Sequence, residues 1–370
     1  MNSRTLIALL ASLAVLVALA IAVSVSQRPD QAAGGPFLPG LREQLNEVSQ
    51  IVVRTGGNRT VATLKRNGDG WTLAERKDYP ADVGRIRQSL IALAEAQILE
   101  EKTSNPEYYE RLKVDDIEKD NAAGVRLDIL AGEQTTSVII GTTGVGGGER
   151  AYARRAGEPA SWLISGRIDT PRETAEWLDR LITDIDAKRI QAVTITHPDG
   201  EVLRIARDSP DAGDFTVAKV PAGRKLSFPG VGNPIGAALS DLRLDSVEPA
   251  AGFAPGAVKP VTARFEARDG LVVEVQSFPL PGGSRLRVAA SADEALAARF
   301  AASKPAGGKP ASESEPEPAS NFEQVKAEAA RLQARHAAWV YAVPEYKAEQ
   351  FTRRMEDLLE SRIAGPPRPE

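Results

Sequence analysis

Two histidines are the first candidates for acid–base chemistry or metal binding, because an imidazole titrates near neutral pH and binds transition metals. His197 and His336 are the only two in this chain of 370 residues. His197 begins a His-Pro-Asp-Gly sequence, which favours a tight turn for conformational reasons alone. His336 is expected at the end of a helix. A site needs convergent partners, and the sequence places none beside either histidine, so no histidine site is predicted.

Paired carboxylates are the second kind of candidate, since two acids can supply the acid and the base of glycoside hydrolysis. The pairs are Asp115 with Asp116, Asp184 with Asp186, and Glu100 with Glu101. Each pair also fits a solvated face or a helix end. The chain has no nucleophile elbow, zinc-protease helix or calcium loop. It also has no cysteine, which excludes thiol catalysis. We therefore predict no catalytic, cofactor-binding or metal-binding residue, and no enzyme.

Residues 141–150 form a glycine-rich stretch of the kind that can cradle a phosphate, because glycines let backbone N–H groups approach an anion. Glu149 stands where a dinucleotide fingerprint needs glycine, and no Lys-Ser or Lys-Thr follows. The stretch also joins two expected strands instead of a strand and a helix. We interpret it as a mobile hairpin loop.

Four tryptophans could line a sugar-binding surface through their flat faces: Trp71, Trp162, Trp177 and Trp339. Three of them fall in strand or helix positions where a large, half-buried side chain is expected. Trp162 and Trp339 also occupy equivalent positions in an internal repeat. Core packing is therefore the favoured interpretation.

The elements that would position these residues follow an apolar N-terminal segment. Residues 5–25 carry no charge, and a helix of this length reaches about 30 Å, enough to cross a membrane core. We predict a signal anchor over residues 1–26 in a bacterial inner membrane, with the bulk of the chain in the periplasm. A cleaved signal peptide is the alternative, because Ala18-Leu-Ala20 has the small-x-small pattern of a cleavage site.

The remaining chain divides by composition. Residues 27–48 are rich in Gly, Pro, Ala and Gln and predict a flexible tether. Residues 49–187 and 188–360 are long enough for two modules. Residues 301–320 within the second module contain no large apolar residue and predict a disordered insertion. Residues 361–370 are expected to be a disordered tail.

Both modules follow one order of elements, which indicates an internal duplication. Each starts with short strands separated by Asn-Gly or Gly-rich turns, the signal of hairpins. In the first module a helical pattern over residues 83–96 comes next, with Ile86, Leu90 and Leu93 on its apolar side and Arg87, Gln88 and Glu95 on its polar side. Asn105 followed by Pro106 then predicts the start of a short helix. Two further hairpins with turns at Gly132 and Gly157 follow, and Gly270 marks a hairpin turn of the second module. Residues 170–185 and 343–359 predict a closing helix in each module. The predicted fold class is α+β, with an N-terminal transmembrane helix followed by two related modules of antiparallel strands with amphipathic helices.

Several short sequences resemble the domain of unknown function 4340 family. They are Trp71-Thr-Leu73, Ile98-Leu-Glu100, residues 102–108 (KTSNPEY), Tyr152-Ala-Arg-Arg155, Ser161-Trp-Leu-Ile-Ser165 and Trp177-Leu-Asp179. Members of that family resemble membrane-anchored bacterial proteins, often encoded with an ATP-binding cassette transporter and a gliding-motility-type auxiliary protein. The resemblance implies an accessory role beside such a complex and assigns no catalytic residue.

The net charge of −4 argues against nucleic acid as a partner. We expect a non-enzymatic extracytoplasmic accessory or adaptor protein with protein partners in an ABC-type transport assembly, and no cofactor. The alternative is a periplasmic module that binds envelope glycan or lipid. A hydrolase whose residues converge only in three dimensions is a further alternative.

Overall fold

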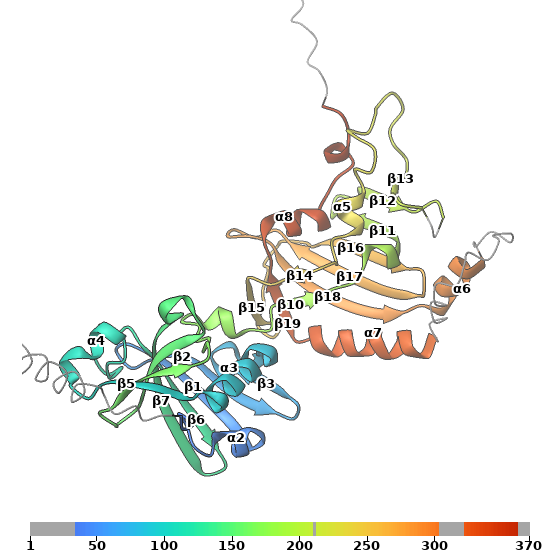
Figure 1. The fold of residues 1–370 in the computed structure, drawn as a ribbon. Coiled ribbons are helices and arrows are strands. Elements are labelled where there is room, and N and C mark those ends of the chain that lie inside the picture. The colour runs from blue at the N-terminus through green and yellow to red at the C-terminus, as the bar shows by residue number, and fades with distance from the viewer. Residues whose placement is uncertain (1–33, 210–211, 303–321, 362–370) are drawn as a thin grey trace, which may run out of the picture. The chain divides into compact units, whose positions relative to one another are not determined.

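The computed structural model describes residues 34–209, 212–302 and 322–361 (Figure 1). The chain divides into two compact units, unit 1 up to Asp179 and unit 2 from Arg180 onwards. The division precedes the boundary at 187/188 expected from the sequence. It does so because β10 (Leu181–Thr183) pairs with β14 (Leu242–Arg243), well inside unit 2.

Unit 1 contains a nine-stranded sheet in the order β4-β3-β2-β1-β6-β7-β8-β9-β5, and every pair is antiparallel. Its strands are β1 (Val48–Thr55), β2 (Arg59–Asn67), β3 (Gly70–Leu73), β4 (Tyr79–Pro80), β5 (Ile98–Thr103), β6 (Val125–Ala131), β7 (Gln134–Thr143), β8 (Arg150–Arg155) and β9 (Ser161–Ser165). The hairpins predicted around Gly132 and Gly157 are confirmed as the β6–β7 and β8–β9 turns.

Helix α3 (Val83–Glu95) lies against this sheet (Figure 1). The Asp82 side chain caps its first turn by accepting a hydrogen bond from the Arg85 N–H. Ile86, Leu90 and Leu93 recur at helical spacing and are buried, so one stripe of α3 belongs to the core of unit 1. The opposite stripe stays outside that core.

Shorter elements complete unit 1. They are α2 (Leu41–Gln44), η1 (Leu45–Glu47), η2 (Ala74–Arg76), η3 (Pro106–Tyr108), α4 (Tyr109–Leu112), η4 (Val145–Gly147) and η5 (Thr174–Trp177). The predicted helix start at Asn105 is confirmed, because its side chain accepts a hydrogen bond from the Glu107 N–H and Pro106 opens the turn. Tyr109 and Val114 pack on Ile139 of β7.

Unit 2 contains an eight-stranded antiparallel sheet in the order β13-β12-β11-β16-β17-β18-β19-β15. Its strands are β11 (Ile190–Thr196), β12 (Val202–Ala206), β13 (Thr216–Val217), β15 (Ser246–Pro249), β16 (Val261–Ala267), β17 (Leu271–Phe278), β18 (Arg285–Ala292) and β19 (Trp339–Ala342). Apart from β4, each strand of unit 1 has a counterpart at the same place in unit 2, so that β1 corresponds to β11 and β9 to β19.

The helical segments of unit 2 are α5 (Asn233–Gly236), α6 (Glu294–Ala302), α7 (Phe322–His336), α8 (Glu345–Ala348), η6 (Ala187–Arg189), η7 (Glu349–Phe351) and η8 (Glu356–Leu358). Helix α7 runs along β18 (Figure 1). The Gln333 side chain accepts a hydrogen bond from the Ala290 N–H of that strand. Arg189 binds Glu328 of α7 and Asp269 through nitrogen–oxygen distances of 2.7 and 2.6 Å.

The α+β prediction is wrong, because antiparallel sheets dominate the described residues and helices are few. Among those residues only α3, α6 and α7 exceed four residues, with 13, 9 and 15. The predicted N-terminal transmembrane helix lies outside the described residues. Within the described part of the chain, no helix has both the length and the hydropathy needed to cross a membrane.

Neither predicted closing helix is continuous: residues 170–185 contain only the short turn η5, and residues 343–359 contain the short turns α8, η7 and η8. Trp177 and Leu178 are buried as predicted, but η5 ends at Trp177 and the backbone is extended from Leu178. The Trp177 carbonyl accepts a hydrogen bond from the Asp82 N–H, and Leu178 forms a bridge with Ala81. These backbone groups therefore bond to a neighbouring segment and not within a helix. Leu359 makes the equivalent bridge in unit 2.

Part of the predicted tether belongs to unit 1. Phe37 is fully buried and its N–H donates to the Ala96 carbonyl over 2.7 Å. The predicted insertion at 301–320 overlaps the last two residues of α6 and otherwise lies outside the described residues. The predicted tail lies outside them after residue 361.

Candidate functional site

His197 has a structural role in the turn between β11 and β12. It is 4% exposed, and its Nε2 lies 3.2 Å from the Arg353 carbonyl oxygen. In the same turn, the Glu201 carboxylate accepts a hydrogen bond from the Met355 N–H over 2.9 Å and pairs with Arg354. The Met355 N–H, followed by the Arg354 charge, lowers the pKa of Glu201. This turn therefore holds residues 353–355 against the sheet.

His336 is enclosed at the end of α7. It is 1% exposed, and its Nδ1 lies 2.8 Å from the Tyr341 hydroxyl. Its Nε2 has no hydrogen-bond partner among the described residues. Burial, helped by the nearby Arg335 charge, lowers the pKa of His336 to about 4, so the ring is neutral at pH 7. The two histidines do not come together with acids into a site.

The acidic pairs are spread over separate fold contacts. Asp115 pairs with Lys119, Asp116 with Arg154, and Glu100 with Lys102; Glu101 accepts from Ser104, Asp184 from the Asp241 N–H, and Asp186 from the Lys188 N–H. Within the described ranges, no three His, Asp or Glu side chains gather in a way that could hold a metal ion.

The glycine-rich stretch is the hairpin connection from β7 to β8, through η4. Gly141 lies directly beneath the backbone of α4, since a Cβ on this residue would sit 2.1 Å from the Leu112 carbonyl oxygen. This glycine therefore permits close packing of two segments of unit 1. The predicted hairpin is confirmed, and its mobility stays a prediction.

The tryptophans do not form one surface. Trp71 and Trp177 are buried in unit 1, at 9% and 1% exposure. Trp162 in β9 and Trp339 in β19 are half-buried and occupy counterpart strands. Their positions agree with the predicted packing role.

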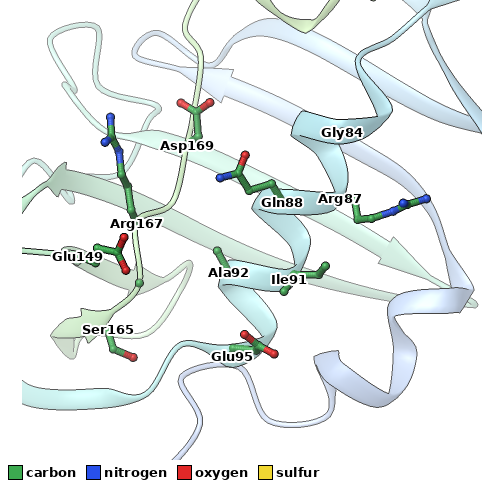
Figure 2. A pocket seen from close by; sticks show the side chains of 11 residues that line it. Gly84, Arg87, Gln88, Ile91, Ala92, Glu95, Glu149, Ser165, Arg167 and Asp169 are labelled. Atoms are coloured by element: carbon green, nitrogen blue, oxygen red, sulfur yellow. The ribbon is translucent and has the colours of Figure 1, made fainter. Parts of the chain in front are cut away.

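A groove of about 910 Å³ in unit 1 is the candidate functional site (Figure 2). One wall is the exposed stripe of α3, and the other is formed by Glu149 and the chain that leaves β9. The lining residues are Gly84, Arg87, Gln88, Ile91, Ala92, Glu95, Glu149, Ser165, Gly166, Arg167 and Asp169. Figure 2 shows Gln88 and Ala92 facing the wall of Arg167 and Glu149, with Arg87 and Ile91 directed away.

Hydrogen bonds fix the two walls relative to each other. Ser89 of α3 donates to the Asp169 carbonyl over 3.0 Å, and Arg85 pairs with the Asp169 carboxylate. The Gly166 N–H donates to the Glu149 carbonyl over 2.8 Å. Gly166 has φ +96°, where other residues are strained, and a Cβ there would lie 3.5 Å from the Ala92 carbonyl. The groove is thus a fixed feature of unit 1.

The charges in the groove are exposed and carry both signs. They come from Arg87, Glu95, Glu149, Arg167 and Asp169, and the Asp169 carboxylate pairs with Arg85. Among the described residues, the other four side chains have no ion-pair or hydrogen-bond partner. A general acid or base is usually desolvated beside a specific partner. The groove instead offers polar recognition on a solvated surface.

The sequence predicts only one wall of the groove. The helical pattern placed Arg87, Gln88 and Glu95 on a solvated face of α3, as observed. No local sequence pattern predicts that Glu149 and Arg167 face these residues. Ile91, 40% exposed on that polar side, was the single available signal of a contact surface.

A second charged cluster occurs in both units on the sheet itself. In unit 1, Asp128 accepts hydrogen bonds from Arg54 and Arg126 over 2.6 and 2.7 Å. In unit 2, Arg264 occupies the register position of Asp128, and Glu266, two residues further along β16, accepts a hydrogen bond from it over 3.3 Å. Each acid offsets the charge of an arginine on its own strand, and Asp128 also offsets that of Arg54 on the neighbouring strand β1, so the clusters stabilise the sheets.

Residues 71–244 match a protein family described as a domain of unknown function (DUF4340). The match starts in β3, ends just after β14, and includes every residue that lines the groove. The chain therefore carries a domain of this family, as the resemblance of its short sequences indicated. No curated protein and no solved structure matches the chain.

Proposed function

We propose that this chain is a non-enzymatic accessory protein whose exported body binds a partner protein at the outer face of a bacterial inner membrane. The groove of unit 1 carries the proposal. Its walls are fixed by hydrogen bonds, yet Glu95, Glu149 and Arg167 are exposed and without partners among the described residues. Protein interfaces have polar rims of this kind.

The dispersal of the other candidate groups favours binding over catalysis. His197, His336 and the acidic pairs each make contacts that hold the fold together. The groove contains no histidine and no buried acid. A reaction at this groove would lack the desolvated acid or base that hydrolysis requires.

The membrane anchor and the transporter partner are proposed from the sequence. The apolar run at residues 5–25 supports a membrane anchor. The implied neighbours of the family support a partner in an ATP-binding cassette transport assembly. Together they suggest a protein that positions one component of that assembly on the periplasmic side.

Affinity purification of the full-length protein in mild detergent tests the proposal. We expect transporter subunits in stoichiometric amounts, identified by mass spectrometry. Glu95→Lys with Glu149→Lys should remove them, because two acidic charges of the groove are reversed. The matched control is Glu43→Lys with Glu133→Lys, which reverses two exposed acids of unit 1 outside the groove.

Two results would contradict the proposal. One is recovery of the wild-type protein alone, combined with thermal stabilisation by cell-wall fragments or lipids. That outcome would favour a glycan- or lipid-binding module. The other is equal recovery of transporter subunits with the groove variant and the control variant, which would place the interface elsewhere.

A further inference from the structure

The two units differ at the place where the groove lies. Ser165 at the end of β9 pairs with Arg150 of β8, and Ala342 at the end of β19 pairs with Arg285 of β18. Because β8 and β9 correspond to β18 and β19, Ser165 and Ala342 are equivalent positions. They mark the points at which the chain leaves the sheet of each unit.

The connection that follows is longer in unit 2. Leu178 and Leu359 mark its end, since each forms the equivalent isolated bridge in its unit. Leu178 lies 13 positions after Ser165, whereas Leu359 lies 17 positions after Ala342. Unit 2 therefore has four additional residues here, which is about one turn of helix.

In unit 2 this connection coils into α8. Ala348 of α8 is 4% exposed, and Phe351 just after it packs edge-on against Phe265 with ring centres 5.9 Å apart. The Lys347 ammonium donates to the Ser240 carbonyl over 2.7 Å, just after the helical turns that start with α5. In unit 2 the short helix α8 thus follows the end of β19 and contacts the end of the helical turns that start with α5.

In unit 1 no helix fills the equivalent place. Residues 166–173 are irregular and contact α3 through Asp169. The groove lies beside this connection and extends along α3 to Glu95, at the end of the helix. The connection after the strand is therefore a short helix in unit 2, and in unit 1 it is an irregular segment with the groove beside it.

We propose that the groove of unit 1 receives a single-turn helix from the partner protein, with an acidic residue at its start and a lysine or arginine near its end. The proposal rests on the proposed function, and α8 is its template, with Glu345 and Lys347 at these positions. The basic side chain would lie between Glu95 and Glu149 and near the carbonyl end of α3, which attracts cations. The acidic side chain would pair with Arg167.

The shape of α3 favours a helical occupant. Gly84, Gln88, Ala92 and Glu95 line the groove at spacings of three and four residues, so one side of the helix is presented along its length. Side chains at these spacings form the ridges that pack against a second helix. The buried stripe of Ile86, Leu90 and Leu93 faces the other way, into the core.

A labelled peptide tests this proposal directly. The probe is the sequence of residues 343–352 of this chain, capped at both ends and held helical by a covalent staple. Titration of the full-length protein in nanodiscs should give saturable fluorescence polarisation. Glu95→Lys in the protein, or glutamate in place of lysine in the peptide, should weaken binding by about tenfold or more. Glu133→Lys is the matched control and should leave binding unchanged.

Crosslinking in cells tests the same groove with the natural partner. Benzoylphenylalanine in place of Gln88 should form an adduct that mass spectrometry maps to a short helix bearing a basic residue. The same group in place of Leu99, exposed on β5, should not crosslink to that segment. Adducts with lipid or glycan only, or the same segment captured from both positions, would overturn the proposal.

The two proposals fail separately. If no transporter subunit co-purifies with the wild-type protein, the proposed function fails, whatever the peptide does. If the subunits co-purify but the peptide does not bind saturably, or binds Glu95→Lys and wild type equally, the proposal for the groove fails. Saturable binding that is lost only on charge reversal within the groove supports the helix as its ligand.

Discussion

Replacing Gly141 with alanine should destabilise unit 1, because the added methyl group has no space. An ideal Cβ would lie 2.1 Å from the Leu112 carbonyl oxygen, 2.9 Å from Val114 Cγ1 and 3.0 Å from the Lys113 carbonyl oxygen. Two of these atoms are backbone, so the chain from α4 to Val114 must move away from β7. Overpacking of this kind costs about 1–3 kcal/mol. For a unit of this size the midpoint of thermal unfolding should fall by roughly 2–12 °C.

Differential scanning calorimetry and hydrogen exchange measure this effect. The exchange of amides between Tyr109 and Val114 should accelerate, because these residues pack on the strand that carries Gly141. Gly148→Ala in the same hairpin is the control. Its φ is −117°, and the nearest atoms beyond its chain neighbours belong to the flexible end of Arg150 at 3.4 Å. Its effect should stay within about 0.5 kcal/mol.

The reasoning is refuted if Gly141→Ala is as stable as the wild type, or if the two substitutions destabilise unit 1 equally. Either result would mean that the glycines act through loop flexibility and not through close packing. Phosphate added during the same measurements should stabilise neither variant, because the hairpin is not interpreted as an anion site.

Three further predictions concern unit 2. Since the pKa of His336 is about 4 in the folded chain and 6.5 ordinarily, the unfolded state takes up its proton first as the pH falls. The free energy of unfolding should therefore decrease by up to about 3 kcal/mol from pH 6.5 to pH 4, and His336→Asn should flatten this dependence in chemical denaturation. Glu201→Gln should lower the free energy of unfolding by about 1–2 kcal/mol. It should also accelerate hydrogen exchange at Met355, whose N–H donates a hydrogen bond to the Glu201 carboxylate. Because the pKa of Glu201 is lowered in the folded chain, its stabilising contribution is complete above the ordinary pKa and is lost as the pH falls through the folded value. Phe351→Ala should cost about 3–5 kcal/mol, since the ring is fully buried against Phe265; Tyr346→Ala, at a residue 65% exposed, is the control, and equal losses would contradict the assignment of the core.

Local signals predicted the strands and hairpins well. The turns at Gly132, Gly157 and Gly270 connect strands as expected. Asn105 caps the short helix that the sequence places after it, and the pattern around Leu90 and Leu93 forms α3. In all these cases the backbone partners are close in sequence, so residue type and spacing suffice.

The closing segments show where such reasoning fails. Trp177, Leu178 and Ile182 are buried, as their spacing suggested, but burial alone does not define the backbone. The Trp177 carbonyl bonds to Asp82 instead of completing a helical turn. A segment that crosses a sheet can satisfy its backbone groups with distant neighbours, and the apolar spacing of such a segment can match that of a helix.

The sequence by itself determined the apolar N-terminal run, the absence of thiol chemistry and catalytic motifs, the family of residues 71–244 and most of the hairpins. Only the tertiary structure decided that Glu149 and Arg167 face Gln88 and Glu95 across a groove. It also decided that the equivalent connection of unit 2 coils into α8. The reason is that a groove has two walls, and the contact between α3 and the end of β9 depends on strand pairing across many residues, which no local pattern records.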